Sequence, residues 1–413
     1  MTIKEEWRTR TDCRLCGAAR LGTVLELAPT PPANEFVRED DQPQELIPLY
    51  LARCADCGHV QLPVVVDPER LFRNYVYVSG TSPAFVRHFR EYAEEAVTLL
   101  GLKPNDLVVD IGSNDGTLLR EFKRLGMRVL GVDPARAIAE EATQAGIPTW
   151  PEFFTRDTAA RIRWEHGEAA LVVANNVFAH ADDLRTIAFG VRDLLSPSRG
   201  CFAFEVQYLV DLVQKTLFDM VYHEHLSYHS LGPLVRFLDS VGMAMVDAQR
   251  VPTHGGSVRC FVAPRRAQKP TARLASLLGD EAAALALSVD PWGDLRRRID
   301  DAGEKLRGLL MVERQAGRQV AGYGAPAKLT TLCHQFGVTR ADISYVVDDS
   351  PWKQGLLAPG TRIPVVAPFS AKHAPDAFVV FAWNFADSIA ARLRTSGYRG
   401  KIVAPLPEYK ELP

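Results

Sequence analysis

The stretch Leu107–Leu119, LVVDIGSNDGTLL, constrains the fold of this 413-residue chain more than any other. Its first three residues are apolar and largely β-branched, which predicts a buried parallel strand, and the glycines that follow allow tight turns beside a ligand. The spacing is D-x-G-x-x-x-G rather than the G-x-G-x-x-G of a dinucleotide pocket. Because the carboxylates of Asp110 and Asp115 would repel a pyrophosphate, the loop favours a cationic ligand.

This loop resembles motif I of the class I S-adenosylmethionine methyltransferases, whose cofactor carries an ammonium and a sulfonium. A second predicted strand, 129–132, ends at Asp133, 23 residues after Asp110, where a carboxylate can accept hydrogen bonds from both ribose hydroxyls. The alternative for Asp133 is a solvated acid at a strand end. We expect S-adenosylmethionine as cofactor, bound by Asp110, Gly112, Ser113, Asn114, Gly116, Asp133, Asn175 and Asn176.

Composition and charge exclude several classes of protein. Hydrophobic residues make up 47% of the chain and charged residues 24%, as in ordinary globular proteins, and the net charge of −2 gives no electrostatic reason to expect nucleic acid or a membrane as partner. No apolar run reaches the roughly 18 to 20 residues of a membrane helix, and the N-terminus is too polar for a signal peptide. We expect a cytoplasmic monomer with two to three domains.

Four of the seven cysteines form two C-x-x-C knuckles near the N-terminus, Cys13/Cys16 and Cys54/Cys57, and a glycine follows each. Four thiolates make a closed tetrahedral zinc site with no open position. The predicted zinc is therefore structural and contributes folding free energy to an N-terminal module of residues 1–80. The alternatives are unrelated free thiols or a redox pair.

The segment Asn74–Ser82, NYVYVSGTS, leads from this module into a helix predicted from about Pro83. Tyr75 and Tyr77 are candidate core aromatics. A run of hydroxyls beside two tyrosines at a domain junction could equally line a substrate cleft. Tyr75 is therefore also a candidate catalytic and substrate-binding residue.

Strands and helices alternate regularly through residues 81–265, which predicts a doubly wound parallel sheet closed by an antiparallel pair at 243–248 and 257–263. Ligands of such sheets bind beyond the carboxyl ends of the strands. We expect three polar clusters at those ends. They are NNVFAH at 175–180, which ends in His180, EVQY at 205–208, and YHEHLSYH at 222–229.

The third cluster has three histidines, two tyrosines and a glutamate within eight residues. A zinc site is one interpretation, although the H-E-x-x-H spacing is absent, and an exposed polar turn is another. The third is general acid–base chemistry, because a histidine with a pKa of about 6.5 accepts a proton at neutral pH and tyrosine hydroxyls can donate to an oxyanion. Carbon methylation next to a ketone needs both functions.

Residues 266–413 begin with a helix-rich stretch, and QVAGYGAPAK at 319–328 then repeats the strand, glycine turn and helix pattern. A second strand ends in acids at 348–349, so a degenerate Rossmann-like module is expected. Gly322 and Gly324 with Lys328 could hold a diphosphate, and a purely structural module is the alternative. The candidate substrate-binding residues here are Gly324, Lys328, Asp348, Lys353 and Asn384.

Together with the zinc knuckles and the DIGSNDGTLL loop, the motifs NNVFAH, YHEHLSYHS, THGGSVR, GYGAPAKLTTL, DDSPWKQG and PGTRIPV resemble the sugar C-methyltransferase family over nearly the whole chain. Known members act on nucleotide-linked 4-keto deoxysugars in antibiotic pathways, and one methylates C3 of a dTDP-3-amino-4-keto sugar. The resemblance implies a class I methyltransferase sheet between a zinc-binding module and a Rossmann-like domain, with a nucleotide-diphosphate ketosugar as substrate. It also implies that His225 is the base, with Tyr222, Glu224 and His180 around the reacting carbons.

The resulting hypothesis is that the substrate binds between the central and C-terminal domains, where His225 removes the proton α to the ketone. Tyr222 or His180 then stabilises the enolate oxygen. Two alternatives stay open from the sequence. One is O- or N-methylation of a sugar or natural product, and the other is a non-catalytic zinc-ribbon binding protein.

Overall fold

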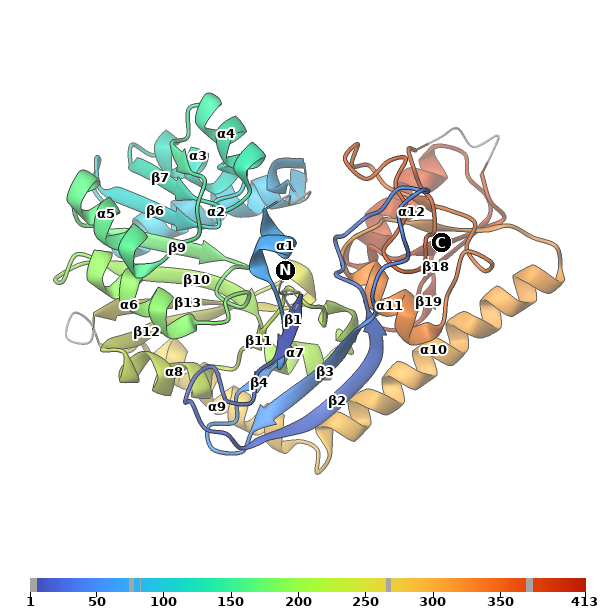
Figure 1. Cartoon of the computed structure of the whole chain (residues 1–413), viewed down its shortest axis with the longest axis horizontal. Coiled ribbons are helices and arrows are strands. Elements are labelled where there is room, and N and C mark those ends of the chain that lie inside the picture. Colours follow the sequence, from blue (N-terminus) through green and yellow to red (C-terminus); the bar gives the residue numbers. More distant parts are fainter. Residues whose placement is uncertain (1–5, 74–77, 82, 265–268, 369–373) are drawn as a thin grey trace, which may run out of the picture.

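The computed structural model describes residues 6–73, 78–81, 83–264, 269–368 and 374–413, whose strands form four sheets. Figure 1 shows the central sheet with its helices on the left, the C-terminal sheet on the right, and the long strands β2 (Leu21–Thr30) and β3 (Ile47–Cys54) along the base between them. The helix α10 (Pro291–Gln315) runs beneath the C-terminal sheet.

The central sheet has the strand order β12-β13-β10-β9-β6-β7-β8. Its members are β6 (Leu107–Ile111), β7 (Arg128–Val132), β8 (Thr149–Trp150), β9 (Leu171–Asn175), β10 (Cys201–Gln207), β12 (Met243–Val251) and β13 (Ser257–Pro264). The strands from β10 to β8 pair in parallel, whereas β13 is antiparallel to both β10 and β12. The predicted doubly wound sheet with a closing antiparallel pair is confirmed.

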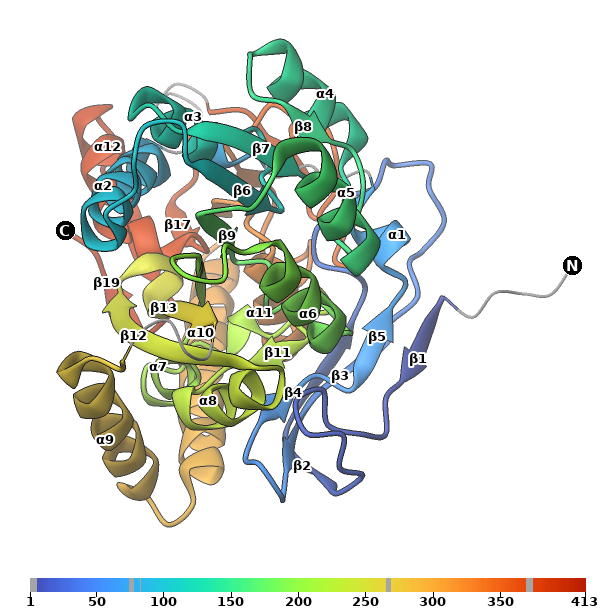
Figure 2. The same ribbon diagram turned by 90° about the vertical axis from the view of Figure 1, so that its left-hand side faces the viewer.

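Helices cover both faces of this sheet because alternate residues of each strand point to opposite sides. Val108 belongs to the core under α2 and α3, whereas its neighbours Leu107 and Val109 belong to the core under α5, α6 and α8. Figure 2 shows α5 and α6 in front of the sheet. The helices of this part are α2 (Pro83–Leu100), α3 (Thr117–Arg124), α4 (Arg136–Gln144), α5 (Arg156–His166), α6 (Leu184–Leu194), α7 (Leu209–Gln214) and α8 (Leu231–Ser240).

The N-terminal sheet has the order β11-β4-β3-β2, all antiparallel, with β4 (Val60–Gln61) and β11 (Ser227–Tyr228). Nearby, β1 (Trp7–Thr9) pairs with β5 (Val64–Val66), and α1 (Pro68–Phe72) follows. The expectation that residues 222–229 end a strand of the central sheet is wrong. They include β11, which pairs with β4 of the N-terminal sheet. The zinc-binding module and residues 222–229, called the reaction segment below, therefore share one ladder.

The C-terminal sheet has the order β16-β15-β14-β17-β18-β19, parallel except for the last strand. The strands are β14 (Val320–Tyr323), β15 (Val346–Val347), β16 (Val365–Val366), β17 (Ala377–Val380), β18 (Lys401–Ala404) and β19 (Lys410–Glu411). The helices are α9 (Ala272–Ala286), α10, α11 (Lys328–Phe336) and α12 (Ala386–Thr395). The parallel strands and their helices form the predicted Rossmann-like arrangement.

One hydrophobic core joins the N-terminal and C-terminal sheets, since Leu25 and Leu49 belong to the same buried cluster as Leu332 of α11. The Ala28 amide donates to Gln335 Oε1 at 2.8 Å across this contact. The N-terminal strands are therefore fixed against the C-terminal unit by packing. Among the described helices, none combines the length and apolar character needed to cross a bilayer.

Candidate active site and metal site

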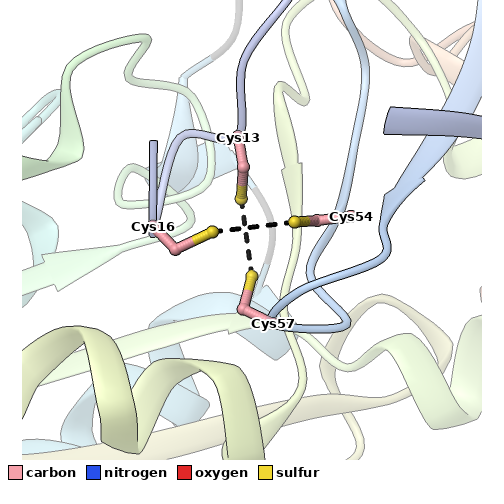
Figure 3. A group of neighbouring side chains, drawn as sticks. All are labelled: Cys13, Cys16, Cys54 and Cys57. Carbon is pink, nitrogen blue, oxygen red and sulfur yellow. Dashed lines mark hydrogen bonds between the residues drawn. The ribbon is translucent and has the colours of Figure 1, made fainter. Parts of the chain in front are cut away.

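Four thiols converge at the start of the N-terminal module, as Figure 3 shows. The Sγ atoms of Cys13, Cys16, Cys54 and Cys57 all lie within 4.8 Å of one another, and two pairs are 3.5 Å and 3.6 Å apart. Zinc–sulfur bonds of about 2.3 Å in a tetrahedron separate the sulfurs by about 3.8 Å. The four side chains therefore fit the predicted structural zinc ion.

Arg14, within the first knuckle, connects this metal site to the reaction segment. Its buried guanidinium donates from Nη1 to the carbonyls of Leu62 at 2.8 Å and Leu226 at 3.1 Å, and from Nε to Asp182 at 3.1 Å. Burial lowers the pKa of Arg14 to about 10, against the opposing charge of Asp182, so the side chain stays protonated at neutral pH. The zinc knuckle thereby anchors the backbone beside His225.

A cavity of about 620 Å³ lies between the central and C-terminal units. It opens at the carboxyl ends of β6, β7, β9 and β10, where a ligand of a doubly wound sheet is expected, and the loops after β14, β15 and β17 form the opposite wall. We call it the interdomain cavity. Most of the site residues predicted from the sequence line this cavity: Asp110, Gly112, Ser113, Asn114, Asp133, Asn175, Asn176, His180, Tyr222, His225, Gly324, Lys328, Asp348, Lys353 and Asn384.

Two buried carboxylates mark the cofactor end of the interdomain cavity. Asp133 accepts the Asn114 amide on Oδ2 and the Ala135 amide on Oδ1, both at 2.8 Å. Burial and the neighbouring charge of Asp133 raise the pKa of Asp110 well above its usual value. A cationic ligand would offset that repulsion, whereas a pyrophosphate would add to it.

The loop between these acids is shaped by glycine and leaves polar atoms free for a ligand. Gly112 has φ +68°, and a Cβ there would lie 2.3 Å from Val177 Cγ2. Ser113 Oγ and both side-chain atoms of Asn175 are buried without a hydrogen-bond partner among the described residues. Because buried polar groups normally find partners, these atoms fit the hydroxyls and amino group of S-adenosylmethionine.

Three aromatic side chains meet in the middle of the interdomain cavity. The ring of His225 lies 4.0 Å from that of Tyr222 and 5.0 Å from that of His180, measured between centroids. His225 Nδ1 lies 2.7 Å from the Met220 carbonyl oxygen, which can only accept, so Nδ1 carries the proton and Nε2 keeps its lone pair. Burial, with the adjacent His180, lowers the pKa of His225 well below its usual value, and His225 is neutral at pH 7.

Backbone contacts hold the first polar cluster, residues 175–180, against the reaction segment. The Ala179 carbonyl accepts the amides of Leu226 at 2.9 Å and Ser227 at 3.0 Å. Burial lowers the pKa of His180 to about 4, and its Nε2 has no hydrogen-bond partner among the described residues. His180 is therefore a second neutral imidazole with a free nitrogen beside His225.

Two lysines form the opposite wall. Lys328 Nζ donates to Asn384 Oδ1 at 2.8 Å, and Lys353 Nζ donates to the Ala325 carbonyl at 2.9 Å. Burial lowers the pKa of Lys328 to about 8 and also lowers that of Lys353. Gly322 does not join this wall, because its missing side chain makes room for Phe381.

Two of the predicted ligand-site residues, Gly116 and Glu224, are described but do not line the cavity. Gly116 has φ +73° and lies against Ile147, so its role is in the turn. Glu224 is buried and accepts a hydrogen bond from Asn34 Nδ2 at 2.7 Å. Tyr75 lies outside the described residues.

Among the lining residues that the sequence analysis did not name as site candidates are Asn34 and His254. Asn34 belongs to the N-terminal PANEF turn and lines the cavity. No sequence pattern near this turn indicates that it lies beside the central sheet. His254 has φ +53° in the THGG turn, and burial lowers its pKa to about 4. A histidine next to two glycines was the available signal for it.

The THGG turn is fixed by Glu205 of β10. Thr253 donates to Glu205 at 2.7 Å, while Arg259 and His88 contact the same carboxylate at 3.0 Å. Burial alone would raise the pKa of Glu205, but His88, Arg259 and Thr253 hold it at about 2. Glu205 therefore orients the turn that carries His254.

The chain matches three protein-family models in succession. They describe a zinc binding domain over residues 13–72, a methyltransferase domain over residues 85–248, and a C-methyltransferase C-terminal domain over residues 252–407. Among curated proteins, C-methyltransferase NovU of Streptomyces niveus is 35% identical over 402 residues, which cover 96% of each chain.

Solved structures also resemble part of the chain. Magnesium protoporphyrin IX methyltransferase from Synechocystis, with bound SAM, is 15% identical, covers 44% of this chain and 81% of its own, and has a TM-score of 0.32. An S-adenosylmethionine-dependent methyltransferase from Clostridium acetobutylicum is 14% identical, covers 43% and 91%, and has a TM-score of 0.36.

Proposed function

This chain belongs to the C-methyltransferase family, and we propose that it methylates C3, the carbon α to the ketone, of a nucleotide-linked 4-keto deoxysugar. The proposed nucleotide is dTDP and the proposed setting is deoxysugar biosynthesis for an antibiotic. The observation that carries the proposal is His225, a neutral histidine with its Nε2 lone pair free, between an acidic cofactor pocket and a wall of lysines.

S-adenosylmethionine is the cofactor, and when bound it supplies an electrophilic methyl group. Asp110, Asp133 and Asn175 are the residues that would hold it, because they place carboxylates and unpaired amide atoms at the carboxyl ends of β6, β7 and β9. The cofactor is cationic and the pocket is acidic. This complementarity favours S-adenosylmethionine over a nicotinamide dinucleotide, whose pyrophosphate is anionic.

His225 would act as general base. The Met220 carbonyl fixes the proton on Nδ1, so Nε2 is the atom that accepts the proton from the sugar carbon. The low pKa keeps the imidazole unprotonated at neutral pH, and the hydrogen bond to Met220 stabilises the imidazolium after transfer. Tyr222 and His180, on either side, would donate hydrogen bonds to the enolate oxygen at C4.

The C-terminal wall would bind the rest of the substrate. Lys328 and Lys353 are cations on one side of the cavity, and a diphosphate is the part of a nucleotide sugar that needs them. Gly324, Asp348 and Asn384 complete the proposed subsite. Glu224 does not line the cavity itself. It would contribute indirectly, because it accepts the hydrogen bond that holds Asn34 at the edge of the cavity.

Proton exchange in the absence of methyl transfer tests the proposal. With S-adenosylhomocysteine in place of the methyl donor, the enzyme in D2O should exchange the C3 proton of a dTDP-4-keto-6-deoxy sugar faster than the uncatalysed background, as followed by proton NMR. The C5 proton, also α to the ketone, is the internal control. Equal rates with and without enzyme would contradict an enolising base.

Asp133→Asn should weaken S-adenosylmethionine binding about 10- to 100-fold, because hydrogen bonds to a charged group contribute about 1.5–3 kcal/mol. Calorimetric titration of the folded variant measures the Kd. Asp157→Asn, an exposed carboxylate in the first turn of α5, is the matched control and should leave the Kd unchanged. An unaltered Kd for Asp133→Asn would remove this residue from the cofactor site.

A further inference from the structure

A buried contact joins the segment that carries His225 to the C-terminal unit. Asp219 lies in η2 (Phe218–Met220) and is fully buried, and Trp383 of η5 (Trp383–Phe385) donates from Nε1 to Asp219 Oδ2 at 2.6 Å. None of the site features described so far uses either residue. The contact lies at the boundary that forms the interdomain cavity.

The ring of Trp383 also supports Lys328. The ammonium of Lys328 lies 3.7 Å from the centroid of this ring, on its face, while the Nε1 edge contacts Asp219. The residue after Trp383, Asn384, accepts a hydrogen bond from the same ammonium. One tryptophan therefore touches both the cavity lysine and the buried carboxylate.

The residue that follows Asp219 in the sequence contacts the proposed base, His225. The next residue, Met220, provides the carbonyl that accepts from His225 Nδ1 at 2.7 Å. The carbonyl after that, of Val221, accepts from Thr331 Oγ1 of α11 at 2.7 Å. Two side chains of the C-terminal unit thus hold the short stretch on which the orientation of His225 depends.

We propose that Asp219 and Trp383 are positioning residues that tie the base His225 of the central unit to the cation Lys328 of the C-terminal unit. Lys328 then acts at the correct distance from the reacting carbon only while this link is made. The proposal rests on the function proposed above, since it assumes that Lys328 contacts the substrate.

The electrostatics give the link a measurable signature. Burial lowers the pKa of Lys328 to about 8 and raises that of Asp219 to about 6, and each charge opposes the effect of burial on the other. The titratable groups of the described residues that interact with Lys328 are Asp219 from η2 and His254 from η3 (Thr253–Gly255), and His254 is neutral at pH 7. Asp219 is therefore the negative charge that keeps Lys328 protonated.

The substitution Asp219→Asn distinguishes the electrostatic effect of Asp219 on Lys328 from a contribution of Asp219 to packing. Asparagine has the same shape, and its Oδ1 can still accept from Trp383, but it carries no charge. We expect the pKa of Lys328 to fall by about one unit or more. The alkaline limb of kcat/KM should move to lower pH by the same amount, because the deprotonated amine no longer binds the substrate.

Competitive acetylation of Lys328, measured by peptide mass spectrometry across pH, gives its pKa in the full-length, zinc-loaded protein without substrate. The control is Asp247→Asn, which removes a buried carboxylate of β12 that is paired with Arg273 of α9, and it should leave the pKa of Lys328 unchanged. Trp383→Phe keeps an aromatic ring under Lys328 but loses the donor to Asp219, and should lower kcat/KM about tenfold or more.

Unchanged acetylation and an unchanged alkaline limb in Asp219→Asn would overturn the proposal, as would wild-type kcat/KM in Trp383→Phe. The acetylation result does not depend on turnover. A shifted pKa of Lys328 in a protein that methylates no ketosugar would support the link between Asp219 and Lys328, and would count against the proposed function instead.

Discussion

His225→Asn is expected to lower kcat about 10²- to 10⁴-fold, the range that a general base contributes, while S-adenosylmethionine binds with unchanged affinity. The asparagine side chain can keep a hydrogen bond to the Met220 carbonyl, so the segment should stay in place. What it lacks is the basic nitrogen. Initial rates of methyl transfer, with cofactor affinity from calorimetry, separate the two effects.

His166→Asn is the matched control, because His166 ends α5 away from the interdomain cavity. It should keep wild-type rates and cofactor affinity. If His225→Asn turned over at more than about a tenth of the wild-type rate, His225 would not be the base. His180, the other neutral imidazole beside it, would then be the next residue to test.

Cys54→Ser should abolish both zinc binding and activity. Structural zinc supplies about 10–16 kcal/mol of apparent binding free energy in small modules, which is comparable to the roughly 5–15 kcal/mol stability of a whole domain. Loss of the ion should therefore unfold the N-terminal module. Since β4 pairs with β11, and Arg14 holds the Leu226 carbonyl, the damage reaches the His225 segment directly.

Metal content by mass spectrometry and thermal unfolding by circular dichroism measure this prediction. Cys333→Ala is the control, because Cys333 is buried in α11 and lies outside the four-thiol cluster. It should keep one zinc per chain. A Cys54→Ser protein with stoichiometric zinc and full activity would show that the cluster has no structural role.

The central sheet could be predicted from sequence because its signals are local. Each parallel strand is a short apolar run followed by a polar loop, and the spacing from Asp110 to Asp133 fits one strand-helix-strand unit. The topology then brings the ends of those strands to one edge. The residues after β6, β7 and β9 line the cavity for that reason.

The surroundings of the reaction segment could not be predicted, because long-range pairing decides them. β11 has only two residues, and its partner β4 lies in a different part of the sequence with no pattern that relates the two. The contact of Asn34 with Glu224 has the same origin. The composition of the YHEHLSYH stretch marks it as unusual, but composition does not predict that the stretch pairs with the N-terminal sheet instead of the central sheet.

Glycines show a second limit of sequence patterns. Gly112 and Gly116 both have positive φ in the motif, yet Gly112 borders the cavity and Gly116 packs against Ile147. The second pair differs in the same way, because Gly322 packs against Phe381 whereas Gly324 lines the cavity. A glycine pattern predicts the turn, whereas tertiary packing determines which glycine meets the ligand.

The site of the transferred methyl group tests the central claim most directly. A panel of dTDP-4-keto deoxysugars is incubated with S-adenosylmethionine labelled with ¹³C in the methyl group, and the product is examined by two-dimensional NMR. The account predicts a ¹³C-methyl bonded to C3, with a long-range correlation to the C4 carbonyl carbon. A ¹³C-methyl on an oxygen or a nitrogen of the sugar would contradict it.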